Sequence, residues 1–412
     1  MSIDKVILNL SSYLTMDVSE LALPENEEPL FIGRKGRVVY LKDAGAFRRY
    51  IDELYCEKHI EQYAYSVEEF IYLVIDIYIK FNGAETIEYD FAQEFECIDL
   101  KEYHVLLPIF HVHMYEPELT IGKNKLVKFQ AISEYIKENN YCLPERMEEI
   151  TQDKYFANIP FVDVVVNARE FHYAYDQAQL RLEEIIRLLN FILYSNYRGL
   201  EVISSITNSG TRDRHFIVNK DWCQISSSVH PSNVKELVLE DVLDFMLDER
   251  YGNRQLFDIF DKSGKNEIEK RISNAVNWVG MAIAEKNNSV AFTQAIYAIE
   301  SLLQYEIKGE VINKSIVATI SESIAFLLGK NLEDRKRVEK RFKELYGIRS
   351  KIAHGKSSEI TAYQVLEAID LAKSLVQELM TNSELNDAST MQKISNYITK
   401  LKYTVVGDVE RN

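Results

Sequence analysis

The chain has 412 residues, which exceeds one typical domain, so we expect two or three domains. Hydrophobic residues make up 46% of it and charged residues 27%, as in an ordinary globular protein, and only 7 Pro and 15 Gly argue against long disordered linkers. The net charge of −16 at pH 7 repels nucleic acid at long range, so any RNA binding must depend on a local basic patch.

The sequence gives no sign of a targeting or membrane-spanning segment. Its amino terminus, MSIDKVILNLSSYL, lacks the basic start, long apolar stretch and cleavage site of a signal peptide. The most apolar helix candidate, Phe70–Phe81, is interrupted by Asp76 and is too short to cross a bilayer. We therefore expect a cytoplasmic protein without membrane contacts.

Motifs for metals and cofactors are also missing from the sequence. The four cysteines fit neither a disulfide framework nor a zinc site, because they lie far apart without CxxC spacing: Cys56, Cys97, Cys142 and Cys223. Gly355-Lys356-Ser357 resembles the end of a P-loop, but position 350 is Ser rather than Gly, so the motif fails. We expect neither a cofactor nor a bound metal.

Residues 1–170 are predicted to form a mixed α/β domain. Short strands are expected at Val6–Leu10 and Val38–Leu41, and helical periodicity covers Ala44–Glu57 and Val67–Phe81. Four further segments are expected to be extended: Thr86–Phe95, Tyr103–Met114, a hairpin over Leu119–Phe129 that turns at Gly122–Asn124, and Phe161–Val166.

Residues 171–265 are predicted to continue this half as part of a sensor or regulatory region. A long helix is expected over Tyr173–Tyr197, with its buried side formed by Leu180, Ile185, Leu188, Leu189 and Ile192. The composition of Thr207–Arg214 indicates a loop, and strands are expected at Phe216–Asn219 and Trp222–Ser226. Gly and Ser residues in Tyr251–Asn266 place the next boundary there.

One histidine pair invites a metal-site interpretation. His111 and His113 would lie on the same face of a strand, since side chains alternate with period two. His104 and several carboxylates are near in sequence, but nothing fixes their geometry. We expect polar side chains on a strand face here rather than metal ligands.

Residues 266–382 are predicted to form an antiparallel helical bundle, followed by a tail over 383–412. Five helices are expected from the apolar periodicity: Ile268–Glu285, Ser289–Tyr305, Ile312–Leu328, Leu332–His354 and Thr361–Met380. Thr361 and Gln364 form a plausible capping box at the start of the last one. The fold class is therefore α+β multidomain, with a mixed α/β region before an all-α bundle.

The segment Leu345–Ser358, LYGIRSKIAHGKSS, carries an Arg and a His five positions apart, Arg349 and His354. Residues five apart on a helix lie roughly 140° apart around its axis. They can converge if the helix ends near His354, because the last turn often departs from ideal geometry. Gly355 suits such an end, because Gly accepts a left-handed conformation without steric cost.

These residue types suit RNA cleavage by the neighbouring 2′-hydroxyl. The imidazole of His354 can take and give protons near neutral pH, and the guanidinium of Arg349 presents a fork of donors that fits a phosphate. The alternative is structural: Arg349 caps carbonyls or pairs with a carboxylate, and His354 is an ordinary histidine at a helix end.

The spacing and its flanking residues resemble the R-x4-H motif of HEPN domains, and the Apea-like subfamily in particular. AFTQAIYAIESLL (Ala291–Leu303) and TISESIAFLLG (Thr319–Gly329) are similar to two other helices of that subfamily, although Ser323 stands where the family often has Arg. The resemblance covers roughly Glu267–Met380, so the bundle is expected to be a HEPN bundle.

The resemblance implies a metal-independent endoribonuclease whose site forms where two copies meet. It makes Arg349 and His354 the catalytic residues, with Ser350 orienting one of them and Glu300 as a polar partner. Glu300 is otherwise a boundary residue at the edge of an apolar stripe.

A basic bias precedes the motif, in Asn331–Leu345. It either guides RNA through phosphate contacts or belongs to a solvated helix with i,i+4 pairs such as Glu339–Lys343. The candidate RNA-binding residues are Arg335, Lys336, Arg337, Lys340, Arg341, Lys351 and Lys356. Tyr346 and Tyr363 are the candidates for base stacking near the motif.

Two functions follow from these observations. The first is an RNA endonuclease, which the resemblance to Apea-like HEPN domains associates with antiphage defence by abortive infection. We expect it to act as a homodimer or higher even oligomer, controlled by an N-terminal region that binds a phage-derived trigger. The second is a non-catalytic HEPN module for dimerisation or for binding nucleic acid or protein.

Overall fold

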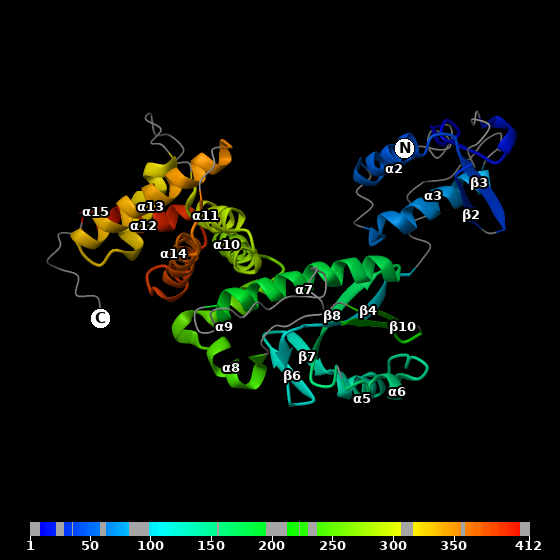
Figure 1. Cartoon of the computed structure of the whole chain (residues 1–412), viewed down its shortest axis with the longest axis horizontal. Coiled ribbons are helices and arrows are strands. Elements are labelled where there is room, and N and C mark those ends of the chain that lie inside the picture. The colour runs from blue at the N-terminus through cyan, green and yellow to red at the C-terminus, as the bar shows by residue number, and fades with distance from the viewer. Residues whose placement is uncertain are drawn as a thin grey trace.

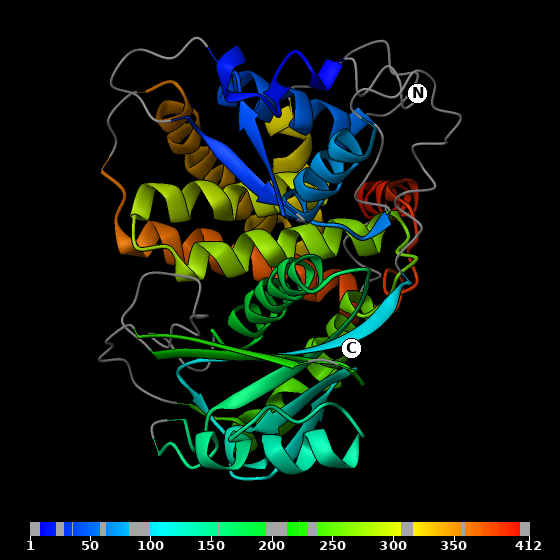
Figure 2. The ribbon, with the colours of Figure 1, turned by 90° about the vertical axis from the view of Figure 1, so that its right-hand side faces the viewer.

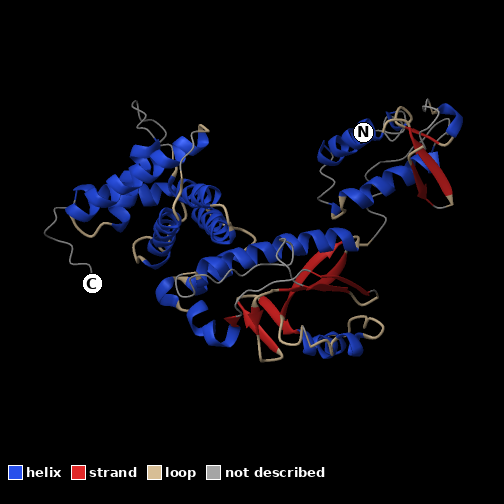
Figure 3. Cartoon of the chain, viewed as in Figure 1, coloured by secondary structure: helices blue, strands red, loops and turns tan. Residues whose placement is uncertain are grey.

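The computed structural model describes residues 9–21, 29–34, 36–57, 63–81, 99–154, 156–194, 212–221, 223–229, 237–305, 316–355 and 359–403. Within these ranges a mixed α/β half extends to about residue 260, and an all-helical region follows (Figures 1 and 3). This is the predicted fold class. No helix in this described part of the chain is long and apolar enough to cross a membrane.

A small N-terminal unit has its own apolar core. Its antiparallel sheet has the order β1-β3-β2, and two helices and a 3-10 turn accompany it: β1 (Leu14–Thr15), β2 (Phe31–Arg34), β3 (Arg37–Leu41), η1 (Val18–Glu20), α2 (Ala44–Glu57) and α3 (Val67–Phe81). The buried residues Phe47, Ile51, Phe70 and Val74 belong to this core. Both helices begin and end at their predicted residues. Of the predicted strand Val6–Leu10 only Asn9 and Leu10 are described, and they are helical.

A six-stranded antiparallel sheet forms the centre of the α/β half. Its order is β10-β9-β4-β8-β7-β6, with strands β4 (Lys101–Pro108), β6 (Glu118–Ile121), β7 (Asn124–Lys128), β8 (Pro160–Ala168), β9 (Arg212–Val218) and β10 (Cys223–Val229). A separate parallel pair joins β5 (Val112–His113) to β11 (Leu237–Val238). The hairpin, β8 and the two late strands were predicted, whereas Thr86–Phe95 lies outside the described residues. Arg212–Arg214, predicted as part of a loop, belong to β9.

Helices cover both faces of this sheet (Figures 1 and 3). Helix α7 (Phe171–Leu193) packs on β4 and β8. On the opposite face lie η3 (Phe129–Ala131), α5 (Ile132–Glu138) and α6 (Met147–Ile150). The strands alternate accordingly: Val105 faces α7, while Leu106 faces the layer of α5 and α6. Strands from both sides of residue 170 thus form one sheet.

The predicted long helix is α7, and its start is fixed by Glu170. The Glu170 carboxylate accepts hydrogen bonds from the backbone N–H groups of His172 and Tyr173, and also from Ser66 of the N-terminal unit. Four of the five predicted buried residues are buried, but Leu180 is 57% exposed. That prediction was wrong because Leu180 lies roughly 160–180° around the helix from the buried Ala178 and Leu189, on the side of α7 that faces away from the core.

The C-terminal region contains the five predicted helices, with ends within four residues of those expected. They are α10 (Glu267–Ala284), α11 (Asn288–Leu303), α12 (Ile316–Leu328), α13 (Leu332–Ala353) and α14 (Ala362–Thr381). Asn266 and Thr361 form capping boxes at the starts of α10 and α14. In the first half of the chain the sequence analysis missed β1, β2, α5 and α6. In the second half it missed β11 and four helical elements: α8 (Leu239–Met246), η4 (Glu249–Tyr251), α9 (Asn253–Phe260) and α15 (Met391–Tyr403). The expected tail therefore includes a helix with four buried residues.

One continuous apolar core runs from the sheet through α7 into the bundle. Figures 1 and 2 both show α7 between the sheet and α10. The two helices approach so closely at Gly280 that an added Cβ would lie 2.4 Å from the carbonyl oxygen of Arg187. On α14, the buried Lys373 donates a hydrogen bond to the carbonyl oxygen of Phe191 near the end of α7. The parts of the chain on the two sides of the predicted boundary at 265/266 share this core.

Candidate active site at the end of helix α13

Helices α11 and α13 carry the residues of the R-x4-H segment and its expected partner. Asn287 caps α11 by accepting from the backbone N–H of Ser289, and Asn331 caps α13 by accepting from that of Asp334. The two buried side chains of α13, Phe342 and Leu345, fix which side of this helix faces the bundle. Arg349 follows Leu345 by four positions, so it emerges on the same side of the helix.

Arg349 forms an ion pair with Glu300 of α11. Its Nη2 atom donates to Glu300 Oε2 at 3.0 Å, and the two side chains are 21% and 12% exposed. Within the described structure, Arg349 Nε is buried and has no hydrogen-bond partner. The carboxylate thus holds one edge of the guanidinium and leaves a buried donor unused.

Aromatic rings flank this guanidinium. Arg349 Cζ lies 5.0 Å from the ring centroid of Tyr297 and 5.5 Å from that of Tyr346, within the range of cation–π attraction. The ring of Tyr297 also packs against Trp278 of α10, with centroids 5.4 Å apart. Burial, together with a hydrogen bond to Glu300, raises the pKa of Tyr346. Tyr346 was a sequence candidate, whereas Tyr297 and Trp278 were missed because only the packing of three helices brings them there.

His354 lies at the end of α13, as the sequence predicted. The helix ends at Ala353, His354 donates its backbone N–H to the carbonyl oxygen of Ser350 at 3.1 Å, and Gly355 adopts a left-handed φ of +69°. The His354 side chain is exposed. Ser350 is half-buried, and its carbonyl oxygen helps to close the last helical turn.

The two residues of the motif point in different directions in one chain. Arg349 is directed at α11, whereas His354, roughly 140° further around the helix, faces solvent. Each contact described above for the Arg349 side chain is to Glu300, Tyr297 or Tyr346, and none involves His354. The helix end was predicted, but the convergence of the two side chains within one chain is not seen among these contacts.

Most of the candidate RNA-binding residues already have partners. Arg335 donates to the carbonyl oxygen of Gly329 at 3.3 Å and lies over Phe326, so it fixes the end of α12. Lys336 pairs with Glu333, Arg337 with Asp334, and Arg341 with both Glu344 and Glu367. Those carboxylates raise the pKa of Arg341.

Two other candidates, Lys340 and Lys351, are exposed and belong to none of the ion pairs described above. Lys356 lies outside the described residues. Eleven positions separate Lys340 from Lys351, so they project from nearly the same side of α13. This helix therefore matches the solvated, ion-paired alternative over much of its length, with two lysines on one exposed side.

The histidine pair near β5 does not lie on one strand face. His111 precedes the strand and has a left-handed φ of +63°, so the alternation expected from His111 to His113 is broken at a turn. That prediction was wrong because the chain turns between β4 and β5. In the parts of the chain that the structure describes, no three His, Cys, Asp or Glu side chains are grouped as a metal site would require.

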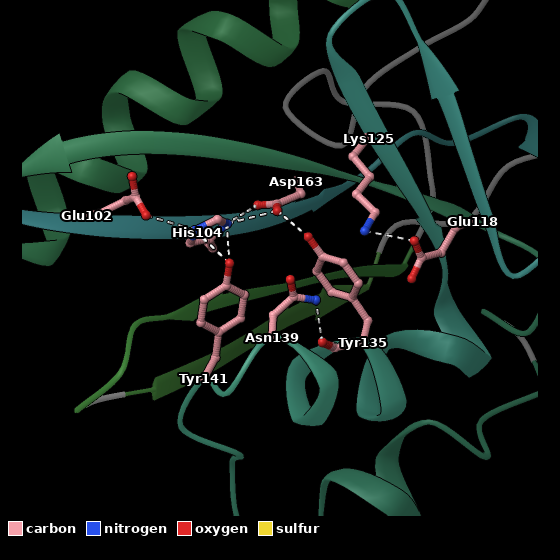
Figure 4. Close-up of polar contacts among 8 residues, drawn as sticks. All are labelled: Glu102, His104, Glu118, Lys125, Tyr135, Asn139, Tyr141 and Asp163. Carbon is pink, nitrogen blue, oxygen red and sulfur yellow. Dashed lines mark hydrogen bonds and ion pairs between the residues drawn. The ribbon is translucent and has the colours of Figure 1, made fainter.

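A second polar group, which we name the His104 cluster, comprises His104, Asp163, Tyr135 and Tyr141 (Figure 4). His104 Nδ1 lies 2.8 Å from Asp163 Oδ2, and the hydroxyl of Tyr135 donates to the same oxygen at 2.6 Å. The hydroxyl oxygen of Tyr141 is 2.8 Å from Nε2 and 3.2 Å from Nδ1 of His104. An oxygen that close to both ring nitrogens lies over the imidazole face rather than in its plane.

The His104 cluster fastens α5 and the segment after it to the sheet. Burial alone lowers the pKa of His104, but the hydrogen bond and charge of Asp163 outweigh it, so the pKa is raised. Burial raises the pKa of Tyr141 to about 12, helped by Asp163 and Glu102. Because Tyr141 stacks on His104 instead of bonding in its plane, we interpret the cluster as a buried structural lock rather than a catalytic relay.

Comparison with protein-family models, with curated proteins and with solved structures gives no match to this chain.

Proposed function

We propose that the chain is a cytoplasmic endoribonuclease in which Arg349 and His354 carry out the reaction, and that it serves antiphage defence by abortive infection. The observation that supports this most is the state of Arg349. Its guanidinium is oriented by Glu300 and two aromatic rings, it retains a buried Nε donor, and it lies within two helical turns of an exposed histidine. The link to defence rests on the resemblance to Apea-like HEPN domains alone.

The proposed reaction uses the RNA's own 2′-hydroxyl as the nucleophile. His354 removes the proton of that hydroxyl, or gives a proton to the departing 5′-oxygen. The 2′-oxygen bonds to phosphorus as the bond to the 5′-oxygen breaks, which leaves a 2′,3′-cyclic phosphate and a 5′-hydroxyl. Arg349 stabilises the charge that develops on the phosphoryl oxygens, and Ser350 helps to orient the helix end.

Two copies of the chain would complete this site. In one copy, His354 is the exposed imidazole at the end of α13, whereas the reaction needs both a base and an acid. A two-fold interface places the same surface of both copies in contact and so brings two such histidines together. Light scattering at micromolar concentration should show a dimer or a higher even oligomer. A monomer that still cuts RNA would refute this part of the proposal.

The chemistry is tested by RNA cleavage in EDTA with analysis of the product ends. We expect activity without divalent ions, cyclic-phosphate and 5′-hydroxyl ends, and no cleavage of DNA, which lacks the attacking hydroxyl. His354→Ala should lose about 10²–10⁴-fold in rate. Because His354 is exposed, the melting temperature of the His354→Ala protein should equal that of the wild type.

His172→Ala, which removes a histidine from α7, is the matched control and should keep full activity. Activity that requires a divalent ion, that yields 5′-phosphates, or that survives His354→Ala unchanged would contradict the proposed reaction.

We further propose that residues 1–260 restrain the nuclease or receive its trigger. Expression of Glu267–Asn412 alone would expose the apolar surfaces of α10 and α14 that α7 covers. Toxicity of that fragment would therefore report on its folding as well as on the loss of restraint. A chain that begins at Asp99 removes the N-terminal unit, which has its own core, and keeps the core shared by the sheet, α7 and the bundle nearly whole. Greater toxicity of this shorter chain at matched expression would support restraint by the N-terminal unit, and equal toxicity would argue against it.

The second candidate function is a non-catalytic module for dimerisation or binding. The Arg349–Glu300 ion pair favours it, because a guanidinium that already holds a carboxylate also serves to tie α13 to α11. A purified chain that binds RNA or dimerises, yet shows no cleavage that depends on His354, would identify this second function.

A further inference from the structure

Two cysteines that are 81 positions apart in the sequence meet on one side of the central sheet. The Sγ atoms of Cys142 and Cys223 lie 3.5 Å apart, with both residues as free thiols. Cys142 belongs to the segment between α5 and α6, and Cys223 is the first residue of β10. The sequence analysis did not pair them, since nothing in their spacing indicates a contact.

The backbones of both cysteines are fastened to the same turn. Cys142 donates its backbone N–H to the carbonyl oxygen of Asn219 at 2.8 Å. Asn219 directly follows Val218, which is the partner of Cys223 in the β9–β10 ladder. The turn is itself braced, because the Asn219 side chain accepts from the backbone N–H of Asp221 at 2.8 Å. The close approach of the thiols thus follows from the positions of two anchored backbones.

Both sulfurs are partly shielded from solvent. Cys142 and Cys223 are half-buried, and Cys223 packs against the apolar layer beneath the sheet. Burial, together with the thiol and charge of Cys142, raises the pKa of Cys223 to about 11. Because the thiolate is the reactive form, Cys223 reacts slowly with oxidants at neutral pH, and Cys142 is the sulfur that an oxidant attacks first.

We propose that Cys142 and Cys223 form a redox modification site, which closes to a disulfide when the protein meets a peroxide. A peroxide first takes two electrons from the Cys142 thiolate: an S–O bond forms, the O–O bond breaks, and one oxygen takes up a proton and leaves as water. The Cys223 thiol then attacks the sulfenic sulfur of Cys142, the S–S bond forms, the S–O bond breaks, and a second water leaves. In total, two thiols and one hydrogen peroxide give one disulfide and two waters.

The geometry requires only a small movement. A disulfide brings its sulfurs to about 2.05 Å, so the two sulfurs must approach each other by roughly 1.5 Å from their present separation. The bond would join the segment beside Tyr141, which stacks on His104, to the hairpin of β9 and β10 at the edge of the sheet. Oxidation would thereby fix an edge strand to the layer of α5 and α6.

The test oxidises the purified full-length chain with equimolar hydrogen peroxide, alkylates the remaining thiols and maps the peptides. We expect a Cys142–Cys223 cross-link, at a rate independent of protein concentration, with the loss of two hydrogen atoms from the intact mass. Cys56 is exposed on α2 and should still be a free thiol that the alkylating reagent modifies. Cys56→Ser should leave the cross-link unchanged, whereas Cys142→Ser should abolish it.

Two further measurements distinguish a disulfide that the fold determines from random oxidation of thiols. The same oxidation in urea should scatter the pairings over all four cysteines. The oxidised wild type should melt at a higher temperature than oxidised Cys142→Ser, because the cross-link restricts the unfolded chain. Separate alkylation of Cys142 and Cys223 after oxidation of the folded chain, or cross-links that favour Cys56, would overturn the proposal. None of these readouts depends on ribonuclease activity.

Discussion

Replacing the buried Lys373 by Met should stabilise the protein at neutral pH. Lys373 is 6% exposed, and the charge of Asp370 offsets only part of the cost of burying its ammonium. Its ammonium donates to the carbonyl oxygen of Phe191 and lies over the rings of Phe191 and Tyr194, 4.7 and 5.8 Å from their centroids. Met has a similar length and no charge, so it fills the same space without the cost of burying an ammonium.

The magnitude follows from the pKa of this lysine. Burial lowers the pKa of Lys373 from 10.5 to about 8, and a shift of that size corresponds to about 3 kcal/mol of unfavourable free energy for the charged form. Loss of the hydrogen bond to Phe191 offsets about 1–2 kcal/mol of this. The net gain in the free energy of unfolding at pH 7 is therefore about 1–2 kcal/mol.

The direction in which the stability difference between Lys373→Met and the wild type changes with pH distinguishes this explanation from a general packing effect. Below pH 8 Lys373 is charged in both the folded and the unfolded chain, so the full cost is present. Between about pH 8 and 10.5 the folded chain loses the proton while the unfolded chain keeps it, so the wild type gains stability relative to Lys373→Met. The difference between the two proteins should thus shrink as the pH rises.

Thermal melting from pH 7 to 10, followed by circular dichroism, measures this difference. A gain of 1–2 kcal/mol should raise the melting temperature by about 1–4 °C. Lys270→Met, at an exposed position of α10, is the matched control and should change little at any pH. A lower melting temperature for Lys373→Met at pH 7, or a difference that stays constant up to pH 10, would refute the reasoning.

Three other changes should alter stability in defined directions. The raised pKa of His104 means that its contribution is fully present below about pH 6.5 and is lost as the pH rises through the folded-state pKa, and Asp163→Asn should remove this dependence in melting curves recorded from pH 5.5 to 8.5. Gly280→Ala places a Cβ 2.4 Å from a backbone oxygen of α7, so it should cost about 1–3 kcal/mol, visible as a lower melting temperature. Arg349→Ala leaves its largely buried carboxylate partner unpaired and should destabilise the chain by about 1–3 kcal/mol, so its activity must be compared at equal folded fraction by urea titration.

The sequence analysis succeeded where local signals determine the structure. Helices α2 and α3 have clear apolar periodicity, and the Thr361 cap has both residues of its capping box. The left-handed Gly355 ended α13 at the expected place. In each case a few neighbouring residues carry enough information.

The missed elements lack such local signals. Helices α8 and α9 have only eight residues each and border Gly252 and the expected boundary. Helix α15 has a mostly polar composition, and its four buried residues acquire a partner surface only from the folded bundle. Short helices of this kind depend on tertiary packing rather than on propensity.

The candidate site was predictable only in part. The order Arg349, His354, Gly355 is local, and Glu300 came from the family resemblance rather than from spacing. The rings of Tyr297 and Trp278 join the guanidinium through the packing of α10, α11 and α13. No pattern along one helix contains that arrangement, because it depends on how the three helices are rotated against one another.

The position of α7 between the sheet and the bundle has a consequence for synthesis of the chain. The sheet side of α7 can be covered soon after translation, but its other side waits for α10 and α14. Helix α14 ends at Thr381, about 190 residues after the end of α7, which corresponds to roughly 10–40 s at common ribosome speeds. During that interval an apolar helix face is bare on the nascent chain, so efficient production of this protein should depend on chaperones that bind emerging polypeptides.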